Sequence, residues 1–138
     1  MYRSVVFISL CPMIACISGF SADTLLTLAG EVGFDMSAWK TEKHFTSWLS
    51  LCPGTNKSGG KVLTGKTKRS ANRAAAAFRI AAAGVAKSKS ALGAFFRRIK
   101  ARAGAPKAIT ATARKLAVLY YTMLKNGSSY IEVGQAAY

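Results

Sequence analysis

The sequence predicts an all-α protein: a helix-hairpin-helix-like N-terminal part, then a basic, glycine-rich loop, then a three-helix C-terminal bundle. Apolar residues make up 51% of the 138 residues, and alanine supplies much of that fraction, which suits closely packed helices better than sheets. Apolar residues also recur at helical spacing, with glycine and proline at the expected helix ends. The length fits one domain over residues 14–132, with an arm or remnant at 1–13 and a tail at 133–138.

Residues 14–51 are predicted to form the helical hairpin part. Gly19 supplies a tight turn, and Ser21 or Asp23 can cap the following helix, which ends at Gly33. A further short helix is predicted over residues 41–51. Its inward-facing residues are expected to be Phe45, Trp48 and Leu49.

Three helices are predicted within residues 70–127. Ser70 can cap the first, which runs to about Val85. The second runs from about Ser90 to Ala103, with a buried stripe of Leu92, Phe95, Phe96 and Ile99. Pro106 opens the third and Gly127 closes it. Its apolar residues follow at separations of four, three, four and three: Ile109, Ala113, Leu116, Tyr120 and Met123.

Charge is the strongest functional signal in the sequence. There are 20 Lys and Arg residues against 5 Asp and Glu, which gives a net charge of +15. No carboxylate occurs between Lys43 and Ile131. Such a surface repels itself unless a polyanion neutralises it. Nucleic acid is the expected partner, and an anionic membrane is the runner-up.

The loop at residues 52–69 contains the stretch NKSGGK. It is not a nucleotide-binding P-loop, because Gly60 stands where lysine is required and Val62 follows Lys61. It is either a flexible Gly/Ser linker or a phosphate-binding turn. In the second case Gly59 and Gly60 offer backbone N–H groups to an anion. Basic residues would crowd around Ser58, a potential nucleophile: Lys57, Lys61, Lys66, Lys68, Arg69 and Arg73.

No metal site or cofactor is predicted in this chain. The cysteines are odd in number and form no C-x-x-C pair: Cys11, Cys16 and Cys52. The single histidine, His44, is of a kind that usually caps a helix or lies on the surface. These features fit a reducing cytoplasm.

The N-terminal stretch MYRSVVFISLCPMIAC imitates a secretory signal, since Arg3 precedes an apolar run. Cleavage after Ala22 would leave the bulky Phe20 where a small residue is wanted. Pro12 interrupts the run well short of the ~20 residues that a membrane span needs. The alternative is a helix that lacks its partner or its upstream half.

Three stretches together resemble the C-terminal transposase domain of the IS110 family of insertion sequences, which are DEDD-type transposases. They are ISGFSADTLLTLAGEVGFDMSAWKTEKHFTSWL, then SWLSLCPGTNKSGGKVLTGKTKRSANRAAAAFRIAA, then LGAFFRRIKARAGAPKAITATARKLAVLYYTMLKNGSSY. The resemblance covers about residues 14–132. Its specific motifs are the leucine–cysteine–proline run, S-G-G-K, the basic residues with Asn72-Arg73, and R-R-x-x-A-R-x-G-x-P-K-A.

The resemblance implies DNA transposition by site-specific recombination, guided by a structured RNA. It implies multimers in which an N-terminal RuvC-like domain contributes four magnesium-binding acids. The C-terminal domain contributes a serine that attacks DNA, and Ser58 is the matching residue. Magnesium is thus expected only for the acidic domain, which would act in trans.

Two departures from the family pattern qualify this expectation. Upstream of residue 14 only thirteen residues stand where the acidic domain is expected, and none is acidic, which suggests a truncated and inactive copy. The hairpin also carries Ser21 at its second glycine position and Leu25 at its usual small residue, which weakens a grip on DNA backbone. The alternatives are a non-catalytic basic helical protein that binds nucleic acid and a membrane-active basic protein.

Overall fold

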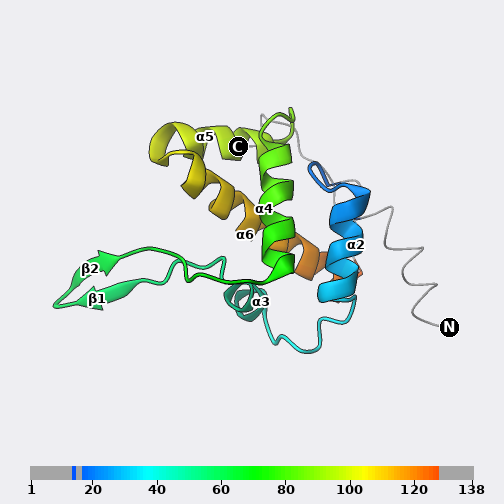
Figure 1. Ribbon diagram of the computed structural model, residues 1–138, viewed down its shortest axis with the longest axis horizontal. Helices are drawn as coiled ribbons and strands as arrows, with labels where there is room; N and C mark the ends of the chain where they lie inside the picture. The colour runs from blue at the N-terminus through cyan, green and yellow to red at the C-terminus, as the bar shows by residue number, and fades with distance from the viewer. Residues whose placement is uncertain (1–13, 15–16, 128–138) are drawn as a thin grey trace.

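The computed structural model describes residue 14 and residues 17–127. Within that part of the chain, five helices and two short strands follow in the order α2, α3, β1, β2, α4, α5, α6. Figure 1 shows the helices gathered into one body, from which the two strands project as an arm. The all-α prediction is right for the body and wrong for the loop, which contains a β-hairpin. The predicted arm 1–13, the tail 133–138, Cys11 and Cys16 lie outside the described residues.

Helices α2 (Ala22–Glu31) and α3 (Glu42–Trp48) begin as the sequence predicts. The Ser21 side chain caps α2 by accepting a hydrogen bond from the Thr24 N–H, and Thr41 caps α3 in the same way. Gly33 adopts a positive φ of 75° just after α2, as expected of a residue that ends a helix. Helix α2 therefore lies where the sequence predicts it, whereas α3 ends at Trp48, three residues before the predicted end at residue 51.

Phe45 lies at the centre of an aromatic cluster that joins α3 to the rest of the body. The side chain of Phe45 is fully buried. The centroid of its ring lies 6.3 Å from that of Phe78 in α4, and 6.4 Å and 5.9 Å from those of Tyr120 and Tyr121 in α6. Trp48 was predicted to face inward, but its exposed fraction is 45%. It lies at the rim of the cluster, where Trp39 covers part of its ring at 5.0 Å and solvent reaches the remainder.

Helix α4 (Arg73–Val85) begins later than predicted. Asn72 is its N-cap and accepts a hydrogen bond from the Ala74 N–H at 2.9 Å, so the expectation that Ser70 caps it is wrong. Ser70 instead accepts a bond from the Asn72 N–H at 3.1 Å and orders the approach to the helix. The alanine-rich inner face of α4 is buried, which lets α2 and α6 pack closely against it.

Helices α5 (Ala91–Ala103) and α6 (Ala105–Asn126) form a helical hairpin at Gly104. Gly127 ends α6 in the left-handed conformation, as predicted, and Ser90, near which the second helix was expected to begin, is the N-cap of α5. Helix α6 packs against α3, α4 and α5. Its predicted stripe is confirmed, because Ala113, Leu116, Tyr120 and Met123 are buried and Ile109 is partly buried. The long helix α6 is thus the central helix, against which α3, α4 and α5 pack.

Two tyrosines of α6 fix the connection between α2 and α3. The Tyr120 hydroxyl donates to the Gly33 carbonyl at 3.1 Å, and burial raises the pKa of this phenol well above its ordinary value. The Tyr121 hydroxyl donates to the Trp39 carbonyl at 2.9 Å. Lys125 adds a bond from Nζ to the Lys40 carbonyl at 2.9 Å. Residues 33–40 are therefore held against α6 although they form no helix or strand.

The turn before α2 lies directly on α4. Gly19 has a φ of 99°, and a Cβ built there would lie 2.4 Å from Val85 Cγ2 and 2.5 Å from the Ala81 carbonyl oxygen. A side chain is excluded on both counts, because the conformation is left-handed and the space is filled. Gly19 therefore permits the close contact between this turn and α4.

Replacing Gly19 tests that contact. Gly19→Ala is expected to lower the free energy of unfolding by about 2 kcal/mol or more, since it adds a strained φ and a clash with backbone. Gly30→Ala is the control, because no atom lies within 4 Å of its added Cβ and its helical position favours alanine. Urea unfolding should separate the two variants, and equal stabilities would contradict the packing of the turn.

Candidate nucleic-acid interface

The arm is a β-hairpin made of β1 (Asn56–Ser58) and β2 (Lys61–Thr64). The strands are antiparallel, with Ser58 opposite Lys61 and an irregularity in register beside Asn56. Gly59 and Gly60 form the two-residue turn, with φ of 55° and 77°. Positive φ at both positions is what the favoured two-residue hairpin turn requires. The two glycines are thus explained by the turn, and an anion nest at their N–H groups stays a prediction.

All of residues 55–66 are exposed, so the arm contributes no side chain to the core. The arm is anchored at its root, where the Gly54 N–H donates to the Lys66 carbonyl at 3.0 Å and Pro53 pairs with Thr67. A two-stranded hairpin without a packed face is only marginally stable in water. Its sequence is therefore free to serve contacts with other molecules.

The tip of the arm brings three of the predicted site residues together. Ser58 and Lys61 are directly opposite, and the Cβ atoms of such pairs are about 5 Å apart. Lys57 precedes Ser58 and pairs with Val62, so its side chain emerges from the other face of the hairpin. The tip thus presents an exposed hydroxyl with one cation on its own face and one on the opposite face.

The remaining predicted cations lie away from the tip. Lys66 is at the root, where its carbonyl accepts the Gly54 bond, and Lys68 and Arg69 follow it in the segment that leads to α4. Arg73 is the first residue of α4 and forms a 3.8 Å ion pair with Glu31. Because these side chains are 80% and 39% exposed, the pair is weak. The predicted ring of six cations is therefore divided between the tip, the root and the helical body.

The arm contains groups that can bind a phosphate but none that can accept a proton from Ser58. Its lysines can neutralise a phosphate, and Ser58 can approach one because it is exposed. Residues 53–67 contain no carboxylate and no histidine that could accept the serine proton. The arm by itself is equipped to position a phosphate, and any reaction at Ser58 needs a proton acceptor from elsewhere.

The turn at residues 17–21, which precedes α2, packs against other parts of the body. Gly19 lies against α4, and the Ser21 Oγ accepts from the Thr24 N–H at 3.3 Å. Leu25 is partly buried against the core. Ser21 and Leu25, where the resemblance implies a glycine and a small residue, thus cap α2 and pack against the core.

The described residues do not fit a magnesium site, since within residue 14 and residues 17–127 no three His, Cys, Asp or Glu side chains gather to hold an ion. His44 is exposed, and its Nδ1 lies 2.7 Å from the Thr41 Oγ1. Cys52 is a free thiol 3.3 Å from the Thr46 Oγ1.

None of the helices in the described part of the chain is both long and apolar enough to cross a bilayer.

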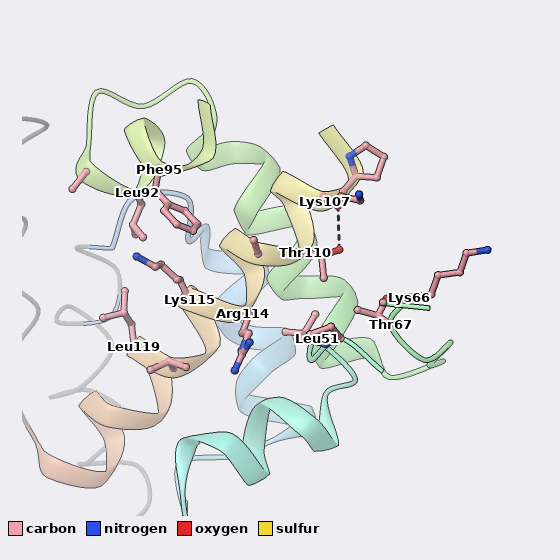
Figure 2. Close-up of a pocket in the computed structure, with 16 residues that line it drawn as sticks. Leu51, Lys66, Thr67, Leu92, Phe95, Lys107, Thr110, Arg114, Lys115 and Leu119 are labelled. Atoms are coloured by element: carbon pink, nitrogen blue, oxygen red, sulfur yellow. Dashed lines mark hydrogen bonds between the residues drawn. The ribbon is translucent and has the colours of Figure 1, made fainter. Parts of the chain in front are cut away.

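A groove of about 1240 Å³ opens beside the root of the arm. Its walls come from the root, from the start of α5 and from α6, and Figure 2 shows the labelled side chains around it. The walls include aliphatic residues and four cations: Lys66, Lys107, Arg114 and Lys115. Phe95, predicted to be buried in the α5 stripe, is only partly buried and lines this groove.

Sequence reasoning missed the groove, although α6 carries a signal for it. Residues 107, 111, 114, 115, 118 and 119 repeat at helical spacing on a face other than the buried stripe, and they mix aliphatic with basic side chains. A face of that kind is a candidate binding surface. Its partner walls could not be found, because they come from segments distant in the sequence.

Comparison with known proteins identifies a family. The family model described as Transposase IS116/IS110/IS902 family matches residues 11–97, more than half of the chain. The matched residues include the arm and α4 and end within α5, so α6 lies beyond them. No curated protein and no solved structure matches the chain.

The turn at the tip can be tested without disturbing the body. Replacing both Gly59 and Gly60 by alanine is expected to unpair the arm, because each alanine must adopt a left-handed φ at a cost of about 1 kcal/mol. The melting temperature of the body should not change, since residues 55–66 are exposed. Gly65→Ala is the control, because no atom lies within 4 Å of its added Cβ. Amide hydrogen exchange would contradict the turn if the double variant kept the protection of the arm.

Proposed function

Because the chain belongs to the IS116/IS110/IS902 family of transposases, we propose that it is the DNA-binding, serine-bearing part of an insertion-sequence transposase. The arm grips the phosphate backbone of DNA, and its tip brings Ser58 to a phosphodiester. The observation that carries this proposal is the projecting, fully exposed hairpin with Ser58 opposite Lys61 at its tip.

Charge supports DNA as the partner. The sixteen basic residues between Lys57 and Lys115 have no acidic neighbours in that stretch of sequence. Those of the arm and its root lie along a single projection, so they can follow a phosphate backbone rather than one isolated anion. The remaining basic residues of the body would add long-range attraction.

The chemical role proposed for Ser58 is nucleophilic attack. Its Oγ would form a bond to phosphorus while the bond from phosphorus to a sugar oxygen breaks, and the departing oxygen would take up a proton. Lys57 and Lys61 would offset charge on the phosphate oxygens. The serine proton must pass to a group outside residues 53–67, which contain no carboxylate or histidine.

That missing acceptor favours a second candidate function. The tip would then position a phosphate without reacting with it, and the chain would be a non-catalytic DNA-binding protein. The two candidates make the same DNA contacts and differ only in the reaction at Ser58.

The resemblance extends the proposal to further partners. An acidic, metal-binding domain acting in trans would complete the reactive site, a structured guide RNA would direct it, and several copies would assemble on DNA. The described residues of this chain offer no set of ligands for the metal.

DNA binding should depend steeply on salt. If six to ten phosphates are contacted, affinity for a duplex should fall by about a thousandfold or more between roughly 50 and 200 mM salt. Replacing both Lys57 and Lys61 by alanine should reduce the slope of log affinity against log salt by about two. Lys89→Ala is the control, because Lys89 lies in the turn between α4 and α5, remote from the arm. A flat salt dependence of the parent chain would remove the basis for DNA binding.

Ser58→Ala separates binding from reaction. Duplex affinity should stay within about twofold of the parent, because the hydroxyl carries none of the phosphate-neutralising charge. In reactions that also contain the acidic domain of a relative, strand breakage and the covalent protein–DNA adduct should disappear. Thr64→Ala removes another hydroxyl from the same arm and should leave both intact. An adduct that survives Ser58→Ala would exclude this serine as the nucleophile.

A further inference from the structure

The groove beside the root of the arm has an apolar floor. Leu92 of α5 and Val118 and Leu119 of α6 contribute to it, and Leu51 and Pro53 close it from the side of the root. Its volume of about 1240 Å³ exceeds that of most small-molecule pockets, and it is lined along several turns of α6. It is therefore sized for a row of side chains rather than for one compact ligand.

Cations stand among these apolar residues. Lys107 and Arg114 come from α6 and Lys66 from the root. Figure 2 shows the Lys66 side chain extending away from the other labelled side chains. None of the groove's lining residues is acidic. The occupant that complements the groove is therefore apolar along its centre and negatively charged along its flanks.

Nucleic acid fits this combination poorly. Proteins that bind single strands offer aromatic faces on which bases stack. The single aromatic residue lining the groove is Phe95, and Lys115 Nζ already lies 4.1 Å from the centroid of its ring. A duplex would set its charged backbone against the aliphatic floor. The floor is instead of the kind that receives an amphipathic helix.

A second copy of this chain fits poorly as well. The exposed apolar side chains of the arm, Val62 at 59% and Leu63 at 65%, offer apolar surface for the floor. They are accompanied by Lys57 and Lys61, however, which would meet the groove's own cations. Like charges brought together in this way oppose association.

We propose that the groove docks an amphipathic helix of a partner protein segment, with an apolar stripe flanked by Asp or Glu. The stripe would lie on Leu92, Val118 and Leu119, and the acids would face Lys107 and Arg114. This interaction is separate from DNA binding by the arm: the arm neutralises phosphates, whereas the groove buries apolar side chains and selects for negative flanks.

Synthetic peptides of about 18 residues are the probes, long enough to form several helical turns. The test peptide has a leucine stripe flanked by glutamate. One control peptide has lysine in place of glutamate, and another has the acidic composition in scrambled order. Each is titrated into the full chain, with affinity read by fluorescence anisotropy and location by the methyl resonances of Leu92, Val118 and Leu119.

The decisive variants are Arg114→Glu, in the groove, and Arg102→Glu, at the exposed end of α5 outside it. Both change the net charge of the chain equally. Arg114→Glu should weaken the acidic peptide by about tenfold, while Arg102→Glu should change its affinity by less than about twofold. The acidic striped peptide should also shift the groove methyl groups.

Any of three results would overturn the proposal. The first is that the acidic striped peptide does not bind, the second that the scrambled or lysine peptide binds equally well, and the third that both variants weaken binding equally. A shift of the groove methyl groups by an oligothymidine but not by the acidic peptide would make the groove a nucleic-acid site instead.

Discussion

Burial of Phe45 is the constraint on which the arrangement of the functional surfaces depends. Its ring contacts aromatic residues of α4 and α6, and so fixes α3 against both helices. The arm leaves the body shortly after α3 and returns shortly before α4. Both limbs of its root are therefore attached to elements that this cluster holds together. The position of Ser58 follows from a buried ring thirteen residues earlier in the chain, although no arm side chain enters the core.

Stability and proposed function are consequently carried by different residues. The body is held by the buried face of α4, by the stripe of α6 and by the close contact of Gly19. The arm is exposed throughout residues 55–66 and is shaped by little more than two glycines and a few backbone bonds at its root. Changes in the arm should therefore alter interactions with other molecules while the body stays folded.

The sequence allowed the helices to be predicted because their signals are local. The stripe and terminal glycine of α6 and the extent of α5 need only nearby residues, and they were found. The hairpin was missed because NKSGGKVLT lacks the apolar alternation of a half-buried strand, although its Gly-Gly pair is a turn signal. Trp48 was misplaced because spacing along a helix assigns a face but does not reveal that the core ends there. The groove was missed because Leu51, Lys66, Leu92 and Arg114 meet only once the chain is folded.

Positive charge alone would favour binding of polyanions everywhere on this chain. The fold places the positive charge in two different settings, the arm and the groove. In the arm, lysines lie on an exposed hairpin whose large apolar side chains, Val62 and Leu63, line no groove, and such lysines can contact a regular row of phosphates. In the groove, cations surround an aliphatic floor, and burying that floor requires apolar side chains that a nucleic-acid backbone lacks. The same net charge can therefore serve two kinds of partner, because the apolar surface beneath the cations differs between the two places.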